Sequence, residues 1–202
     1  MARKIGTNGA DSIGGTSLSD WLAGLRGNDV INGYRGNDDI YGGDGNDRLY
    51  GGDGNDEIEG GAGDDRLWGQ QGHDELDGDG GDDSISAGGG NDDLDGGSGN
   101  DVMHAGSGND TLDGGSGNDI LTGGSGADEF EFERGDGRDT LADFQNGLDR
   151  IDLDDFSAAQ VAQIIGAARQ QGGDLVLILD SATSITLEDM QRAQLDLSDF
   201  SF

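Results

Sequence analysis

The sequence predicts an all-β fold in which short strands stack into a coiled solenoid, followed by a small C-terminal α/β cap. Two observations predict it. A nine-residue repeat runs fourteen times from Gly6 to Glu131 without an insertion or a deletion, and after Glu131 the period stops and the composition changes. A fixed period means that each unit repeats the same backbone path. We therefore divide the chain into a repeat region, residues 6–131, and a C-terminal region, residues 132–202.

Two of the nine positions are constant in character along the chain. The nonad at residues 42–50, for example, reads Gly-Gly-Asp-Gly-Asn-Asp-Arg-Leu-Tyr. The eighth position is always large and apolar, and the fourth is Gly in thirteen of the fourteen nonads, with Leu18 the exception. The sixth position is Asp in all fourteen nonads: Asp11, Asp20, Asp29, Asp38, Asp47, Asp56, Asp65, Asp74, Asp83, Asp92, Asp101, Asp110, Asp119 and Asp128.

The spacing of these positions predicts a local structure. Glycine recurs where a backbone needs positive φ or must approach another group closely, so we expect the first six residues of each nonad to form a turn. The last three would form a short strand, with the eighth side chain inward and the seventh and ninth outward. Two nonads then make one coil, and each nonad stacks on the next but one at about 4.8 Å.

This stacking sorts the fourteen aspartates into two columns, each with one aspartate per coil. Carboxylates at strand spacing cannot all stay ionised without cations between them. Glycine-rich turns also expose carbonyl oxygens, and a set of carboxylate and carbonyl oxygens suits calcium rather than zinc or copper. Seven turns in each column leave six gaps, so the sequence predicts up to about twelve Ca²⁺ sites held by the fourteen aspartates.

The repeat resembles the RTX (repeats-in-toxin) family, whose signature is a glycine- and aspartate-rich nonapeptide. The resemblance covers residues 6–131. It implies a right-handed parallel β-roll in which calcium ions lie between stacked turns. The sixth-position carboxylates and the turn carbonyls are the ligands that the resemblance implies.

The composition of the chain indicates that the fold depends on bound metal. The chain has 42 Gly, no Pro, only 31% hydrophobic residues and a net charge of −32. Ordering each residue costs about 1–2 kcal/mol, and a core one residue thick is not expected to offset that cost alone. Twelve divalent ions would reduce the net charge from −32 to −8. We therefore expect metal binding and folding to be one transition, with a disordered calcium-free chain.

Several function classes are excluded. The chain has no Cys and two His, and it lacks zincin, nucleophile-elbow and phosphate-loop motifs, so we do not expect an enzyme. The start of the chain has no apolar run that would make a signal peptide, and no segment is apolar enough to span a membrane. We expect no nucleic acid partner. Extracellular calcium modules have dissociation constants of about 10⁻⁴–10⁻³ M, which predicts an extracellular location.

The C-terminal region has a different pattern. Residues 139–144 and 149–153 alternate like short strands, and residues 175–179 and 185–187 read as a hairpin. Ser157 and Gln160 make a capping box before an apolar helical face that includes Val161 and Ile164. We expect these elements to protect the open edge of the solenoid.

This region also resembles the segment that follows RTX repeats in secreted bacterial proteases and alginate epimerases. The resemblance rests on Asp143-Phe144, Gly147, Asp149, Ile151-Asp152-Leu153 and the end Leu197-Ser198-Asp199-Phe200-Ser201-Phe202. It implies an uncleaved signal that is read by a type I secretion apparatus. We expect the chain to fold nearly as well without residues 199–202.

The two outer faces differ in charge. Even-numbered nonads carry acids at the outward seventh and ninth positions, whereas odd-numbered nonads give Arg48, Tyr50, Arg66 and Trp68 at their centre and an apolar end at Val102 and Ile120. This asymmetry has three interpretations. It is random decoration, or the C-terminal helix covers the apolar end, or the aromatic-basic patch binds an anionic glycan or a cell surface.

The sequence therefore favours a secreted calcium-binding RTX protein. The start at Met1, five residues before the first repeat, favours a stand-alone protein. The alternatives are the carrier and secretion module of a larger enzyme, and a module that binds an extracellular polysaccharide through the Arg48, Tyr50, Arg66 and Trp68 face.

Overall fold

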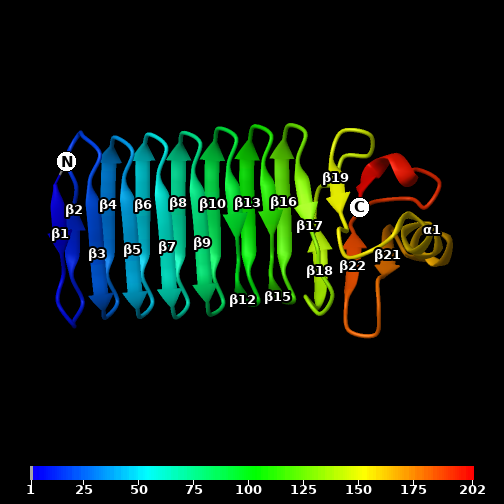
Figure 1. Cartoon of the computed structure of the whole chain (residues 1–202), viewed down its shortest axis with the longest axis horizontal. Coiled ribbons are helices and arrows are strands. Elements are labelled where there is room, and N and C mark those ends of the chain that lie inside the picture. Colours follow the sequence, from blue (N-terminus) through cyan, green and yellow to red (C-terminus); the bar gives the residue numbers. More distant parts are fainter. Residues whose placement is uncertain (1) are drawn as a thin grey trace.

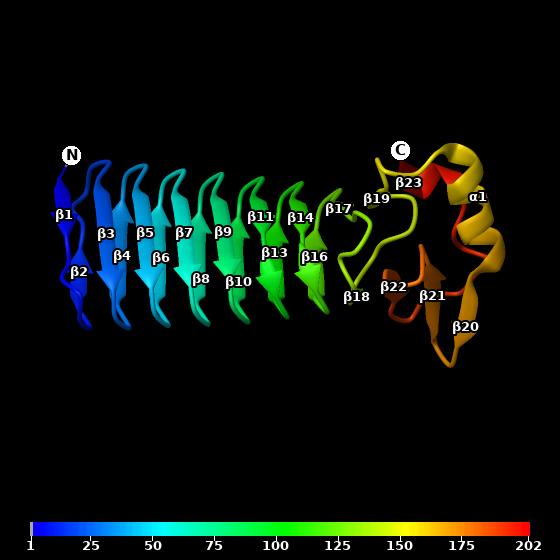
Figure 2. The same ribbon diagram turned by 60° about the horizontal axis from the view of Figure 1, so that its bottom comes forward.

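The computed structural model describes residues 2–202 as a long stack of strands with a small cap at its C-terminal end. Figure 1 shows the chain winding from the N-terminus at one end to a cap at the other, and Figure 2 shows that two layers of strands lie behind one another. From β1 to β11 consecutive strands alternate between the two sheets, so each sheet pairs strands that are one coil apart. The all-β parallel β-roll that the sequence predicts is confirmed.

Within residues 2–202 the two sheets have twelve and eleven strands. The 12-stranded sheet contains β1 (Arg3–Ile5), β3 (Trp21–Arg26), β5 (Asp39–Asp44), β7 (Glu57–Ala62), β9 (Glu75–Gly80), β11 (Asp93–Asp95), β12 (Ser98–Gly99), β14 (Thr111–Asp113), β15 (Ser116–Gly117), β17 (Glu129–Glu131), β19 (Arg150–Asp152) and β23 (Phe200–Ser201). The 11-stranded sheet contains β2 (Ser12–Gly14), β4 (Val30–Arg35), β6 (Arg48–Asp53), β8 (Arg66–Gln71), β10 (Ser84–Gly89), β13 (Val102–Ser107), β16 (Ile120–Ser125), β18 (Arg138–Leu141), β20 (Arg169–Gln171), β21 (Asp174–Ile178) and β22 (Ser184–Leu187).

The strands of the repeat region are longer than the sequence predicts. Most have six residues, as in β6 (Arg48–Asp53), and run through the first three positions of the next nonad. The expected six-residue turn is therefore wrong, because the first-position glycines lie in strands and only positions four to six turn the chain. The register itself is as expected, since Leu49 pairs with Leu67 eighteen residues later.

The core is a single file of eighth-position side chains between the two sheets. Leu49, Ile58 and Leu67 are fully buried, as are most others of the file. The file continues past the last nonad through Leu141 and Ile151, so the apolar core of the roll and that of the cap are one cluster.

The roll extends beyond residues 6–131 at both ends. At the start, β1 pairs with β3 and puts Lys4 in register with Leu22, at an eighth position. The Lys4 ammonium donates a hydrogen bond to the Gly14 carbonyl, so a charged group ends the core file. At the other end, β18 and β19 add a further coil to the two sheets. The change of sequence pattern therefore comes one coil before the change of fold.

The cap contains the predicted helix and hairpin. Helix α1 (Ala158–Ala167) begins after Ser157, whose N–H donates to the Gln160 side chain, and it buries Val161 and Ile164. Strands β21 and β22 pair antiparallel, and β22 pairs parallel with β18. Ile120 remains 44% exposed, so the idea that the helix covers the apolar end of the outer face is wrong.

The end of the chain is part of the fold. A short 3₁₀ helix, Leu197–Asp199, leads into β23, which pairs with β19. Asp199 is 2% exposed and accepts the Gly147 N–H, and Phe200 is 5% exposed. Asp199 and Phe200 thus add buried side chains to the cap, so we now expect the loss of residues 199–202 to cost stability.

Candidate metal centre

The structure brings the fourteen sixth-position aspartates together as two columns along the roll. In each column the Oδ1 atom of one aspartate accepts the backbone N–H of the aspartate one coil earlier. All twelve neighbouring pairs make this bond, at 2.6–3.1 Å. One column contains Asp11, Asp29, Asp47, Asp65, Asp83, Asp101 and Asp119, and the other contains Asp20, Asp38, Asp56, Asp74, Asp92, Asp110 and Asp128.

These carboxylates are buried, which is unusual for ionisable groups. All but Asp11 are at most 3% exposed. Their Oδ2 atoms have no hydrogen-bond partner among residues 2–202 in twelve nonads, from Asp29 to Asp128. A buried carboxylate oxygen without a donor costs several kcal/mol unless a cation binds it. The orphaned Oδ2 atoms therefore fit a row of cations inside each column.

In most nonads a first-position glycine leaves space beside the orphaned oxygen, whereas Ala87 and Ala105 occupy this position in the nonads of Asp92 and Asp110. A Cβ added to Gly24 would lie 2.2 Å from Asp29 Oδ2 and 2.6 Å from the carbonyl oxygen of Gly42 in the next coil. Gly42 repeats this geometry with Asp47 Oδ2 at 2.5 Å and the Gly60 carbonyl at 2.4 Å. A carboxylate and a backbone carbonyl from successive coils thus point into one small space.

The fourth-position glycine has a different role. Gly90 has a φ of +151°, and a Cβ there would lie 1.3 Å from the Gly72 carbonyl oxygen. Successive turns therefore approach so closely that only hydrogen fits between them. This packing holds the carbonyls of neighbouring turns at a constant separation along the column.

The fifth position forms a second ladder that runs in the opposite direction. In nine of the twelve neighbouring pairs within residues 2–202, the side chain of one residue accepts the backbone N–H of the residue one coil later, as when His73 N–H donates to Asn55 Oδ1 at 3.1 Å. His73 continues the ladder, because its Nδ1 accepts the Asn91 N–H at 2.7 Å. Exposed His73 therefore has a structural role in place of asparagine. The sequence signal for this ladder was the frequent Asn before each Asp.

Burial gives the repeat aspartates raised pKa values. Burial, and then neighbouring carboxylates, raise the pKa of Asp56 and Asp65 from the usual 3.8 to about 7. Burial also raises the pKa of Asp74 and Asp110 to about 6, with a neighbouring carboxylate again adding to it. A stack of carboxylates that resists ionisation at neutral pH is one that gains from a bound cation.

The first two turns differ from the rest. Thr7 and Thr16 occupy the second position, and their N–H groups donate to the Oδ2 atoms of Asp11 and Asp20, both at 2.6 Å. Burial raises the pKa of Asp20, but hydrogen bonds from Ala2 and Thr16 together lower it below the usual value. Leu18, at the fourth position, does not have a positive φ. Its N–H donates to Thr16 Oγ1 at 3.2 Å. These turns satisfy their aspartates with protein donors.

The columns continue past the last nonad, which sequence periodicity missed. Asp119 N–H donates to Asp139 Oδ1 at 3.1 Å, and Asp128 N–H donates to Asp149 Oδ1 at 3.2 Å. Asp139 Oδ2 is another buried oxygen without a partner among the described residues, whereas Asp149 Oδ2 accepts the Gln145 N–H. The spacings of twenty and twenty-one residues hid both aspartates from a search with a period of nine.

The donor set suits a hard cation. Within residues 2–202, no three side chains of His, Cys, Asp or Glu come together as a metal cluster. Each gap offers two aspartates and backbone carbonyls instead. Zinc prefers four nitrogen or sulfur ligands, whereas calcium accepts six to eight oxygens, many of them carbonyls.

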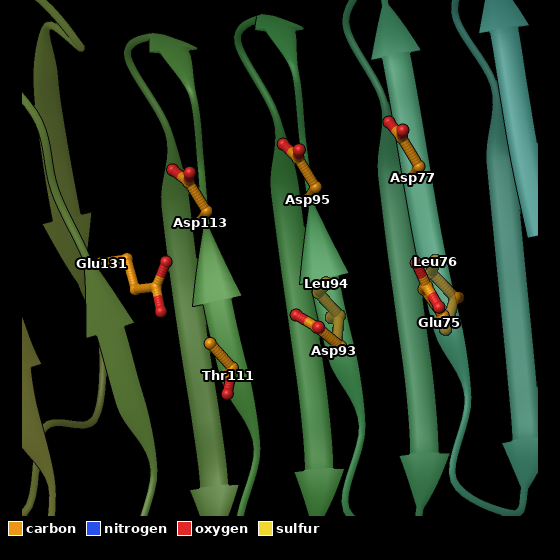
Figure 3. Close-up of a pocket in the computed structure, with 9 residues that line it drawn as sticks. All are labelled: Glu75, Leu76, Asp77, Asp93, Leu94, Asp95, Thr111, Asp113 and Glu131. Carbon is orange, nitrogen blue, oxygen red and sulfur yellow. The ribbon is translucent and has the colours of Figure 1, made fainter.

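Another group of acids lies on the outer face of the 12-stranded sheet. Asp77, Asp95 and Asp113 are in register on successive strands, and Figure 3 shows their carboxylates in one row with Glu75, Asp93 and Glu131 nearby. Burial, with the charges of Asp113 and Asp77, raises the pKa of Asp95 to about 6. These side chains make the outer face of the 12-stranded sheet acidic.

Stacked glycine-rich turns, two buried aspartate columns and a single apolar file define a nonapeptide-repeat β-roll of the calcium-binding class. The family model of the RTX calcium-binding nonapeptide repeat matches six overlapping stretches that together span residues 14–141. The chain belongs to this family. No curated protein matches the sequence.

Two solved structures match this chain over nearly its whole length. The crystal structure of the extracellular lipase LipA from Serratia marcescens matches with 22% identity and a TM-score of 0.56, over 99% of this chain and 40% of the lipase. The solution structure of the AlgE6R3 subunit of the Azotobacter vinelandii mannuronan C5-epimerase matches with 20% identity and a TM-score of 0.34, over 98% of this chain and 80% of that one. This chain thus spans less than half of the lipase.

Across residues 2–202, no helix has both the length and the apolar character needed to cross a membrane.

Proposed function

We propose that this chain is a secreted calcium-binding protein whose folding is driven by extracellular calcium. The observation that carries the proposal is the set of thirteen buried Oδ2 atoms, twelve in the nonads and one on Asp139, that have no partner among the described residues. Calcium would supply the positive charge that balances these carboxylate oxygens, and membership of the RTX family supports calcium as the metal.

The proposed ligands are the fourteen sixth-position aspartates and the turn carbonyls beside them. The first two turns would bind most weakly, because Thr7 and Thr16 already donate to Asp11 and Asp20. The strong sites would lie from Asp29 onward, and Asp139 would extend one column by one site beyond the expected twelve.

Calcium counting tests this assignment. Equilibrium dialysis at millimolar calcium should give about twelve ions per chain, with zinc unable to replace them at equal concentration. The double variant Asp65→Asn and Asp83→Asn should lose up to three ions, because these two aspartates border three gaps, and Asp180→Asn, on a turn of the cap, should lose none. Two or three ions per chain would contradict the column assignment.

We also propose that the chain is exported by a type I secretion apparatus through its C-terminal region. The resemblance at residues 143–153 and 197–202 supports this, as does the extracellular lipase among the structural neighbours. Expression beside a type I exporter should release the chain to the medium. A chain lacking residues 143–202 should stay inside the cell, and its release would contradict the proposal.

A second candidate function is the carrier module of a larger enzyme, with no catalytic group of its own. The observation that favours this candidate is that 99% of this chain aligns with only 40% of the lipase, so a roll of this kind forms part of a larger enzyme there. Activity assays of the isolated chain with ester substrates test this point. Turnover by the isolated chain would contradict the proposal that it is not an enzyme.

A further inference from the structure

A row of outward side chains on the 11-stranded sheet is interrupted at one place. Tyr50, Trp68, Ser86 and His104 are in register on successive strands β6, β8, β10 and β13. Tyr50 and Trp68 are aromatic and His104 carries an imidazole ring, but Ser86 between them is small. The row therefore has one missing ring.

The orientation of the two aromatic rings shows how that gap is shaped. The Tyr50 and Trp68 rings stack with centroids 4.5 Å apart and planes 4° from parallel. That distance is close to the strand spacing of about 4.8 Å, so the ring faces look along the roll axis. The second face of Trp68 is thus turned toward the coil of Ser86. His104 lies a further coil on, roughly 9.6 Å from the Trp68 position, which leaves room for one ring between them.

Two arginines beside this row carry charge that the protein does not neutralise. Arg48 and Arg66 are in register on β6 and β8, and both are exposed. Among residues 2–202, the guanidinium group of neither makes a salt bridge or a hydrogen bond, whereas Arg26 and Arg35 pair with Asp44 and Asp53 at 3.1 and 3.2 Å. Two adjacent cations without partners, in a chain of net charge −32, favour an anionic ligand.

We propose that the gap over Ser86 binds one acidic sugar ring of an extracellular polysaccharide. One apolar face of the pyranose would stack on Trp68, and its other face would meet His104. The Ser84 and Ser86 hydroxyls lie on the same outward surface, where they can bond to sugar hydroxyls. Arg66 is adjacent to the gap and would pair with the sugar carboxylate.

This site goes beyond the proposed calcium function and needs only a folded roll. Its surroundings favour a sugar over a flat aromatic anion, because the strand beside Trp68 offers the hydroxyls of Ser84 and Ser86. The acidic outer face of the other sheet repels the same ligand, so binding is confined to one side of the molecule.

Calorimetric titration with a tetrasaccharide of glucuronic acid tests the site. The full chain is used at a calcium concentration that gives complete β structure by circular dichroism, so a failure to fold is seen separately from a failure to bind. We expect saturable binding of the acidic tetrasaccharide, weakened by salt, and at least tenfold weaker binding of a neutral glucose tetrasaccharide. Equal binding of the two would overturn the proposal.

Four variants locate the site. Trp68→Ala should weaken binding about five- to tenfold, the loss expected from one stacking contact. Arg66→Gln should weaken the acidic ligand alone. Ser86→Trp fills the gap while keeping every native ring, so it should abolish binding, and it decides the matter if Trp68→Ala does not fold. Thr122→Trp adds a ring to the same row outside the gap and should bind like the wild type. If Ser86→Trp binds as tightly as the wild type, the gap is not the site.

Discussion

At the residue scale, each repeat aspartate uses its two carboxylate oxygens differently. Asp83 Oδ1 accepts the Asp65 N–H at 2.7 Å, which ties one coil to the previous one. Asp83 Oδ2 is buried without a partner among the described residues. One atom thus fixes the stacking of the turns, and the other is available for a cation.

Replacing a central aspartate should therefore cost more than replacing a terminal one. Asp83→Ala leaves the buried Asp65 N–H without its acceptor, about 1–3 kcal/mol, and removes a ligand shared by two gaps. Asp11→Ala affects only an end site, where Thr7 already donates to the carboxylate. The calcium midpoint of folding should rise severalfold for Asp83→Ala and little for Asp11→Ala. Equal shifts would contradict the column arrangement.

A glycine between two turns gives a second prediction at this scale. Gly90→Ala places a methyl group 1.3 Å from the Gly72 carbonyl oxygen, in a backbone of positive φ. The loss of stability should exceed about 4 kcal/mol, so that the variant fails to fold at calcium concentrations that fold the wild type. Gly166→Ala is the control, since a Cβ there meets nothing within 4 Å. Wild-type calcium dependence of Gly90→Ala would show that the turns are not so closely packed.

At the element scale, the repeat region was predictable and the ends were not. A period of nine predicts the register, the inward file and the columns, because one backbone path is copied fourteen times. The strand length was missed, because glycines at positions one to three look like turn residues although they pair in β6. Lys4 was missed because a charged residue is not expected at the inward position that β1 gives it. The period of nine identifies the fourteen sixth-position aspartates as candidates. It does not identify Asp139 and Asp149, because they lie twenty and twenty-one residues after Asp119 and Asp128.

The cap depends on the last strand. Phe200 is 5% exposed and pairs with Ile151, so Phe200→Ala should cost about 3–5 kcal/mol and raise the calcium midpoint. Phe202 is 47% exposed, and Phe202→Ala should leave the midpoint within error. Circular dichroism during calcium titration measures both. If the two variants behave alike, β23 does not contribute to the stability of the cap.

At the scale of the whole molecule, the raised pKa values make folding depend on pH. Asp56, Asp65, Asp101 and Asp119 have folded pKa values of about 7, against a usual value of 3.8. Between about pH 4 and pH 7 the folded chain therefore binds more protons than the unfolded chain, and without metal its stability rises as the pH falls. The same protons compete with calcium.

This direction of the pH dependence leads to a prediction in two parts. In chelator, the β signal of the chain should increase when the pH falls from 7.5 to 4.5, because protons neutralise the columns. In calcium, the midpoint should move to higher calcium concentration over the same change. Circular dichroism at the two pH values measures both. A midpoint that does not change with pH would show that the buried aspartates are not the ligands.

The central claim is that calcium and the fold form together, and far-UV circular dichroism during a calcium titration tests it most directly. We expect a disordered spectrum in excess chelator at neutral pH. We also expect a steep transition to β structure at roughly 0.1–1 mM calcium, since each ion ties two coils and ordering one coil presents half of the next site. A compact β-roll in excess chelator at neutral pH would contradict it.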